Sequence, residues 1–138
     1  MSLIYLLDTN TISEPIKKIP NQQVLEKLAR FAPVCAISAF TVFELIKGAY
    51  QIPESKKRQA ILNYAEKTFS QFPILPYTKD SANWHGQETA RLISIGKSPS
   101  FLDSQIAAVA KINHLVLVTR NTDDFKYFAD LKLENWFI

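Results

Sequence analysis

Short, almost purely apolar runs punctuate this sequence at residues 3–7, 34–37, 74–75 and 115–118. Runs this short and this apolar indicate strands buried on both faces, as in a parallel sheet covered by helices. Between the runs, apolar residues recur with the helical period of 3.6, which predicts helices over 24–31, 42–49, 61–72, 79–95 and 102–110. Alternating strands and helices predict an α/β fold with right-handed crossovers.

The size of the chain favours one domain over residues 1–138. The clearest break, at residues 96–100, leaves too short a remainder for a second core. Hydrophobic residues make up 47% of the chain and charged residues 21%, which excludes a disordered protein. The net charge of +3 permits an anionic partner without requiring one.

The N-terminus and the single cysteine indicate a cellular compartment. Cys35 is alone, so the chain has neither an internal disulfide framework nor a thiolate zinc site, and a reducing environment fits. The apolar run at residues 3–7 is too short for a signal-peptide core and has no basic lead-in. No stretch approaches the length of a membrane span. We therefore expect a soluble, cytoplasmic protein.

Several acids fall where strands end or where the following helices begin. Asp8 ends the first apolar run, and Glu44 lies early in the helix after the second. Asp103 opens the helix after the 96–100 loop, and Asp123 and Asp124 follow the last strong run. In a parallel α/β sheet these positions share one edge, where ligands bind. We expect these acids to converge there.

Converging carboxylates raise one another's pKa, and a bound cation removes that cost. A set of hard oxygen ligands suits Mg²⁺ or Mn²⁺ and not Zn²⁺. Such ions activate a water and stabilise the leaving oxygen of a phosphodiester. The acids therefore lead to the hypothesis of metal-dependent phosphodiester hydrolysis.

Each acid also has a purely structural interpretation. Ser100 to Asp103 and Thr41 to Glu44 both match the spacing of a helix capping box. Asp8 suits a turn or an N-cap, and the pair at 123–124 suits the start of a short helix. The functional interpretation depends on the whole set, because all the positions map to one edge of the sheet.

Four segments resemble, in order, the motifs of a PIN domain. They are the apolar run with Asp8-Thr9-Asn10, the segment 38–45 with Gly48 after it, the segment 101–108 and the segment 118–125. The chain length and the closing residues 133–136 resemble the VapC-type toxins of bacterial type II toxin–antitoxin pairs. The resemblance covers essentially the whole chain. It implies a three-layer α/β/α sandwich around a mainly parallel sheet.

The resemblance also implies an activity and its partners. It implies an endoribonuclease that depends on Mg²⁺, with Mn²⁺ as a substitute, and that forms a homodimer. A cognate VapB-like antitoxin protein would inhibit it. Asp8, Glu44 and Asp103 match the three most regular acids of the family. Asp8 and Asp103 would bind the metal directly, and Glu44 directly or through water.

The fourth acid departs from the commonest family pattern. Many members carry an acid at the position of Asn121, where this chain has an amide. In members with the Asn-Thr pattern the acid directly before Phe is the usual candidate, which is Asp124, with Asp123 as the alternative. Asn10, Thr119 and Asn121 itself would orient the carboxylates.

RNA binding requires contacts to phosphates, and we expect Lys97 and Arg120 to make them, because both lie in loops near the acidic edge. His85 and His114 lack the spacing of metal ligands, so we expect structural roles for them. Two alternatives remain. A non-catalytic PIN-like module would bind RNA or a protein partner, and Asn121 keeps that possibility open. A haloacid-dehalogenase-type phosphatase is disfavoured, because Asn10 stands where that family has a second Asp.

Overall fold

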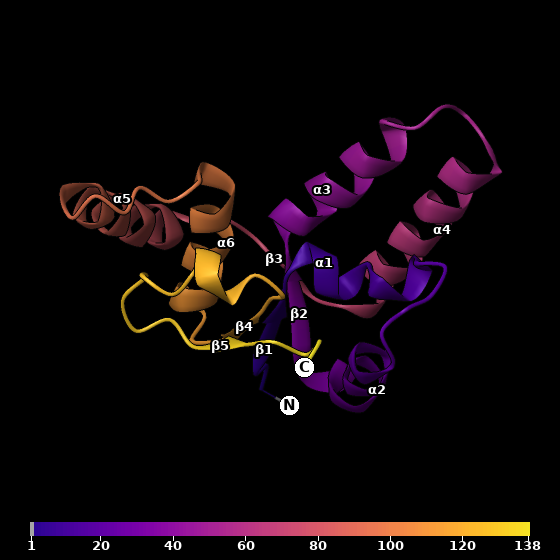
Figure 1. Ribbon diagram of the computed structural model, residues 1–138, viewed down its shortest axis with the longest axis horizontal. Coiled ribbons are helices and arrows are strands. Elements are labelled where there is room, and N and C mark those ends of the chain that lie inside the picture. Colours follow the sequence, from indigo (N-terminus) through magenta and orange to yellow (C-terminus); the bar gives the residue numbers. More distant parts are fainter. Residues whose placement is uncertain (1) are drawn as a thin grey trace.

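A five-stranded sheet forms the centre of the computed structural model, which describes residues 2–138 (Figure 1). The strand order is β3-β2-β1-β4-β5, and every neighbouring pair is parallel. The strands are β1 (Tyr5–Leu7), β2 (Cys35–Ser38), β3 (Ile74–Leu75), β4 (Val116–Val118) and β5 (Leu133–Glu134). The predicted parallel α/β sheet is confirmed, and the first four strands lie within the four apolar runs or one residue beyond them.

Helices cover both faces of this sheet. The α-helices are α1 (Thr9–Ile12), α2 (Gln22–Phe31), α3 (Ala39–Tyr50), α4 (Lys56–Gln71), α5 (Lys79–Ser94) and α6 (Phe101–Ile112), and the 3₁₀ turns are η1 (Glu14–Ile16), η2 (Ala32–Val34) and η3 (Thr122–Asp124). Figure 1 shows α5 and α6 to the left of the strands and α1 to α4 to the right. The three-layer α/β/α sandwich is therefore confirmed.

Successive residues of β1 feed two separate cores. Leu6 joins the core that α5 and α6 cover, whereas Leu7 joins the core of α1 to α4. Both side chains are fully buried, as the alternation of side chains along a strand requires when helices lie on both faces. Trp136 closes the second core just after β5, with its ring 5.2 Å from that of Tyr5.

Within residues 2–138, each of the six α-helices begins at a side chain that caps its first turn. The caps are Asp8, Asn21, Ser38, Ser55, Thr78 and Ser100. Ser100 accepts from the amide of Asp103, as the capping-box interpretation predicts. The corresponding prediction for Thr41 is wrong. Ser38 caps α3 by accepting from the Thr41 amide, so Thr41 lies inside the helix and is buried.

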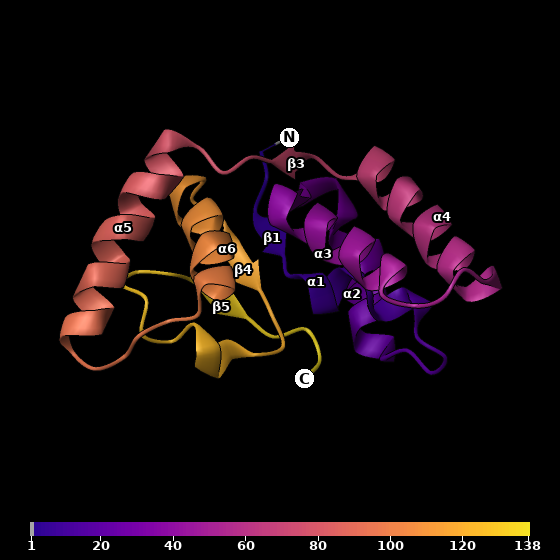
Figure 2. The ribbon, with the colours of Figure 1, turned by 90° about the horizontal axis from the view of Figure 1, so that it is seen from above.

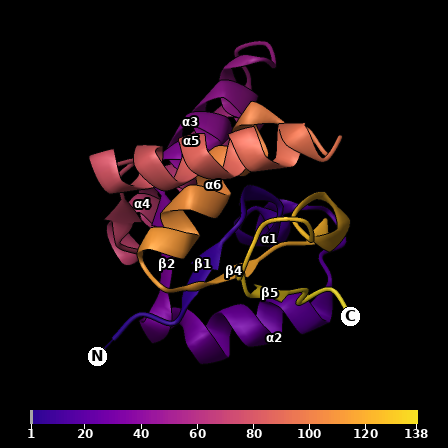
Figure 3. The ribbon, with the colours of Figure 1, turned by 90° about the vertical axis from the view of Figure 1, so that its left-hand side faces the viewer.

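The topology brings distant segments of the chain together at the carboxyl edge of the sheet. The chain after β1 builds β2 and β3 on one side of β1, and β4 and β5 lie on the other. Such a reversal leaves a crevice outside the carboxyl ends of the strands. Figure 2 shows α3 and α6 facing each other across this position, between α4 and α5, and Figure 3 shows α2 beneath the strands on the opposite face from α6. No helix within residues 2–138 has the length and apolar character needed to cross a lipid bilayer.

Candidate active site

Asp8 stands at the end of β1 and caps α1. Its Oδ1 accepts from the Thr9 amide at 2.8 Å, and its Oδ2 accepts from the Thr119 hydroxyl at 2.8 Å. Thr119 follows β4, the neighbouring strand, and is fully buried. The backbone amide of Asp8 also donates to the carbonyl of Val118 at 2.8 Å. Two adjacent strands therefore hold this carboxylate in one orientation.

Glu44 lies on α3 and lines the same cleft as Asp8. The Thr9 hydroxyl donates to Glu44 Oε1 in a short hydrogen bond. The same hydroxyl lies 3.1 Å from that of Thr41, one turn earlier on α3. Glu44 makes no ion pair with Lys47, whose Nζ lies 5.3 Å from the centre of the Phe43 ring. The Glu44 carboxylate is therefore hydrogen-bonded to α1 at the residue that directly follows Asp8.

Asp103 opens α6, and its amide donates to Ser100 Oγ at 3.0 Å. The pKa of Asp103 is raised above its ordinary value, mainly by burial, with a further contribution from the nearby charge of Asp124. The helix-capping interpretation of Asp103 is therefore compatible with the functional one. Its backbone takes part in the cap while its carboxylate remains available at the surface of the cleft.

These acids line one cleft of about 320 Å³. Its walls come from the start of α1, from α3, from α6 and from the loop after β4, and the lining residues are Asp8, Thr9, Asn10, Ser13, Phe40, Glu44, Ser100, Leu102, Asp103, Ile106 and Asn121. A second cleft of about 350 Å³ adjoins it and shares Ser100 and Asp103. Asp123, Asp124 and Lys97 line this second cleft.

The electrostatics of Asp8 show that the carboxylates influence one another. Burial is the main reason that the pKa of Asp8 lies above its ordinary value, and the charges of Glu44 and Asp103 raise it further. The hydrogen bonds from Thr119 and Thr9 oppose this shift because they stabilise the ionised form. A cation placed among these oxygens would relieve both the repulsion and the cost of burial.

The donor set fits a hard divalent cation in an open site. It consists of carboxylates together with Asn10 Oδ1, which is buried against the cleft and accepts no hydrogen bond from any of residues 2–138. Within residues 2–138, no three Asp, Glu, His or Cys side chains approach closely enough to enclose an ion by themselves. Mg²⁺ keeps several waters and binds through a few carboxylates and substrate phosphates, so it does not need such a cage.

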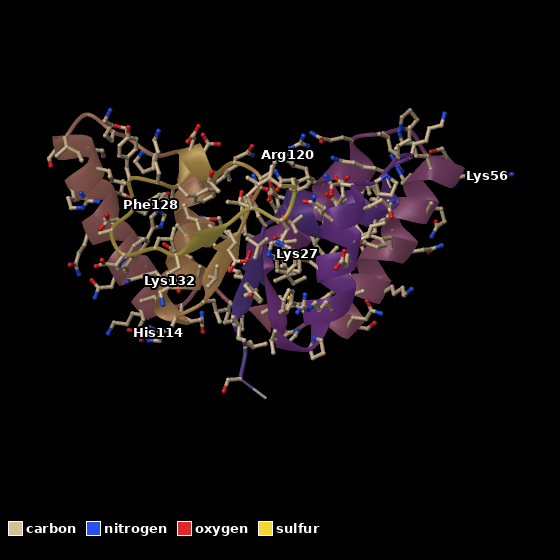
Figure 4. The ribbon with its side chains drawn as sticks, turned by 60° about the horizontal axis from the view of Figure 1, so that its bottom comes forward. Lys27, Lys56, His114, Arg120, Phe128 and Lys132 are labelled. Carbon is tan, nitrogen blue, oxygen red and sulfur yellow. The ribbon has the colours of Figure 1, made fainter. Side chains whose placement is uncertain are left out.

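The remaining predicted residues divide between the cleft and its rim. Thr119 and Asn121 are connected, because the Asn121 amide donates to Thr119 Oγ1 at 3.1 Å. Lys97 lies at the second cleft, with its Nζ 4.8 Å from the centre of the Tyr127 ring. Arg120 lines neither cleft, and Figure 4 shows it on the loop after β4. Its guanidinium lies over the Phe137 ring at 4.8 Å.

Two contributions to the cleft were not predicted from the sequence. Thr9 links Glu44 to α1, although its place directly after Asp8 offered a signal. Ile106 supplies apolar wall from α6, and its helical spacing from Asp103 could have indicated it, whereas the helical spacing of Phe40 and Glu44 does predict the apolar wall on α3. His114, in contrast, lies away from the acids and borders a separate depression together with Lys132 (Figure 4).

The sequence is similar to that of a known protein family. The model of the PIN domain family matches residues 5–131. The chain belongs to the PIN domain family. Among curated PIN-domain relatives, Ribonuclease VapC2 of Haemophilus influenzae is 35% identical over 137 residues, covering 97% of this chain and 98% of the relative. The tRNA(fMet)-specific endonuclease VapC of Shigella flexneri is 31% identical over 134 residues, covering 97% and 98% of the two chains.

Solved structures of PIN-domain toxins share the fold. The FitAcB crystal structure from Neisseria gonorrhoeae aligns with a TM-score of 0.89 and 33% identity, covering 96% of this chain and 98% of that chain. DNA-bound VapBC from Salmonella typhimurium aligns with a TM-score of 0.86 and 31% identity, covering 97% and 98%. The predicted membership of the PIN domain family, with similarity to VapC-type toxins, is confirmed.

Proposed function

We propose that this PIN-domain protein is a Mg²⁺-dependent endoribonuclease, with Mn²⁺ able to substitute, and that it is the toxin of a type II toxin–antitoxin pair. One observation carries the proposal. Asp8, Glu44 and Asp103 come from three distant segments of the chain and line a single cleft. This occurs in a chain similar over nearly its full length to proteins named as VapC ribonucleases.

Asp8 and Asp103 would bind the ion directly, and Glu44 would bind it directly or through a water. Asp124 would be the fourth acid, from the adjoining cleft. A divalent ion held by these oxygens would lower the pKa of a bound water and neutralise charge that develops on the phosphate. Oxygens of the RNA phosphodiester would complete its ligands, which suits a cleft that does not enclose an ion with carboxylates alone.

The residues around the acids keep them in position. The Thr9 amide and the Thr119 hydroxyl each donate to one oxygen of Asp8 and fix its plane. Asn10 would offer its buried carbonyl oxygen to the ion or to a water bound by the ion. Lys97, beside Asp103 and Asp124, would contact a neighbouring phosphate. Arg120 would have to leave the Phe137 ring to reach the same strand.

Cleavage of RNA by the purified protein tests the activity. Total RNA and a bulk tRNA pool are incubated with Mg²⁺, with Mn²⁺ and with EDTA, and Asp103→Asn protein prepared identically exposes any contaminating ribonuclease. We expect cleavage by the wild type with either metal, and none with EDTA or with the variant. Full activity of the variant would exclude the site, and the absence of both RNA cleavage and metal binding would favour the non-catalytic module.

The toxin assignment has its own test. We propose a VapB-like antitoxin as the protein partner, RNA as the substrate, a homodimer as the assembly and the cytoplasm as the location. Expression should arrest bacterial growth, and co-expression of an adjacent small gene should relieve the arrest. Asp103→Asn protein should be harmless at equal abundance. Unimpaired growth with abundant soluble wild type would contradict the toxin role and leave the nuclease proposal standing.

A further inference from the structure

His85, on α5, forms hydrogen bonds through both nitrogens of its ring, and Nε2 connects it to the first turn of α6. Nδ1 lies 2.7 Å from the Tyr77 hydroxyl, and Nε2 lies 2.7 Å from Ser104 Oγ. The residue is only 6% exposed, and its ring lies 5.4 Å from that of Phe101. The proposed hydrolysis assigns no role to His85, although the His85 ring is hydrogen-bonded to the helical turn that contains Asp103.

The surrounding acceptors define the direction of these hydrogen bonds. Ser104 Oγ also lies 2.8 Å from the Ser100 carbonyl and 3.1 Å from the Phe101 carbonyl. A carbonyl only accepts, so the Ser104 proton points to one of them, as is common for serine within a helix. The Ser104 oxygen therefore accepts from Nε2–H of His85, and Tyr77 donates to Nδ1. Burial lowers the pKa of His85, which agrees with a neutral ring.

This chain of hydrogen bonds ends at the backbone that presents Asp103. Ser104 directly follows Asp103, and its amide and hydroxyl both donate to the Ser100 carbonyl. Ser100 in turn caps the helix by accepting from the Asp103 amide. Within residues 2–138, His85 is the only side chain from another element that forms a hydrogen bond with the turn 100–104. The loop before this turn is exposed at residues 96–98.

We infer that His85 is a positioning residue: the chain Tyr77–His85–Ser104–Ser100 fixes the turn of α6 that presents Asp103, so that metal affinity depends on a side chain that never touches the metal. The inference rests on the proposed function, because it assumes that Asp103 is a ligand. Partners that orient a ligand commonly change metal affinity by about 10- to 100-fold when they are removed.

Two substitutions of His85 separate its hydrogen bonds from its bulk. His85→Phe keeps an aromatic ring against Phe101 and removes both hydrogen bonds. Ser104 keeps its bond to the Ser100 carbonyl, and Tyr77 is 43% exposed and can bond to water, so neither hydroxyl loses its last partner. His85→Gln keeps an N–H near the position of Nε2. The second variant is therefore the rescue variant.

The experiment measures Mn²⁺ affinity by electron paramagnetic resonance and amide hydrogen exchange at residues 100–104. We expect His85→Phe to weaken Mn²⁺ binding by about 10-fold and to speed exchange of the Asp103 and Ser104 amides, with most of both effects restored in His85→Gln. Nitrogen-15 NMR of the wild type should show the proton on Nε2. The assignment is direct, because the chain has two histidines and His85→Phe leaves only His114.

Three results would overturn the inference. The first is that His85→Phe binds Mn²⁺ and exchanges its amide hydrogens as the wild type does. The second is that His85→Phe and His85→Gln lose the same Mn²⁺ affinity, and the third is that the His85 ring of the wild type carries its proton on Nδ1. Asp103→Asn serves as the reference for a lost ligand. If wild type and Asp103→Asn both fail to bind Mn²⁺, the proposed metal site fails. The exchange rates and the ring proton then still decide whether His85 fixes this turn.

Discussion

Thr119 shows how one hydroxyl connects two parts of the site. It is fully buried after β4, donates to Asp8 Oδ2 at 2.8 Å and accepts from the Asn121 amide at 3.1 Å. Valine has nearly the same shape but neither donates nor accepts, so Thr119→Val leaves the fold in place and frees the carboxylate to rotate. The rotation of one metal ligand is more damaging to catalysis than to folding.

We therefore predict that Thr119→Val lowers the RNA cleavage rate by about 10-fold or more, whereas Thr119→Ser retains most of it because serine keeps the hydroxyl. Initial rates at saturating Mg²⁺ check this, with urea unfolding as the test of folding. Equal rates for wild type and Thr119→Val would show that the orientation of Asp8 does not depend on this bond.

The fourth acid is a choice between two neighbours in η3. Asp103 and Asp124 line the same cleft, and the charge of Asp124 contributes to the raised pKa of Asp103. Asp123 has a side chain that is 91% exposed, and it lies 3.6 Å from the ammonium of Lys126. The geometry therefore supports Asp124, in agreement with the family pattern.

We predict that Asp124→Asn lowers cleavage more than Asp123→Asn does, with a loss of roughly 10-fold or more for the first. Both variants remove one charge from the same short turn, so each is the matched control for the other. The comparison uses cleavage rates over a range of Mg²⁺ concentrations. The reverse order of activity loss would move the fourth ligand to Asp123.

At the scale of elements, Glu88 fastens α5 to the segment that follows η3. The residue is 8% exposed, and its Oε1 accepts from the Ala129 amide at 3.0 Å and from Arg91 Nε at 2.9 Å. Arg91 also donates to the Tyr127 carbonyl at 2.7 Å. Burial alone would raise the pKa of Glu88, but these hydrogen bonds outweigh it and hold the pKa below its ordinary value.

A lowered pKa means that the ionised carboxylate stabilises the fold. This contribution is complete above the unfolded pKa of about 4.5 and disappears as the pH falls through the lower folded value. We predict that Glu88→Gln loses about 1 kcal/mol near neutral pH and less in acid, as measured by urea unfolding. Glu66→Gln, on an exposed face of α4, is the control. An equal loss at both pH values would show that charge is not involved.

Most of the helices and strands could be predicted from the sequence, but fewer of the side-chain contacts between them could. Buried parallel strands must be apolar on both faces, so β1, β2 and β4 were visible as continuous runs, whereas the exposed edge strand β3 was visible as a short apolar run between two prolines. The four-residue helix α1 is too short to show a period. The hydrogen bond from Thr9 to Glu44 depends on how α3 packs against α1, which local spacing does not encode. The acids of three distant segments could be placed together because topology alone carries strand ends to one edge.

At the scale of the whole molecule, β1, like β2 and β4, contributes buried side chains to both cores. Leu6 faces the core that contains Phe125 and borders Trp84, and Leu7 faces the core that contains Trp136. Because both leucines are on one short strand, loss of either core should unfold the other. This is the physical basis for expecting one cooperative domain over residues 1–138.

We predict that Leu6→Ala and Leu7→Ala each cost about 2–5 kcal/mol of stability, and that both cores melt together. Each core has its own tryptophan, so Trp84→Phe and Trp136→Phe leave single reporters of opposite sides of the sheet. Their fluorescence transitions in urea should have the same shape and should each move with both leucine variants. Two transitions at different urea concentrations would contradict a single domain.

The central claim is that sequence-distant carboxylates form a divalent-metal site, and equilibrium binding of Mn²⁺ tests it most directly because it needs no substrate. Wild type, Asp8→Asn, Asp103→Asn and the exposed control Asp130→Asn are titrated under identical conditions. We predict saturable binding by wild type and control, weakened by at least about 10-fold in both active-site variants, with all four proteins folded. Equal Mn²⁺ affinity in all four would contradict the account.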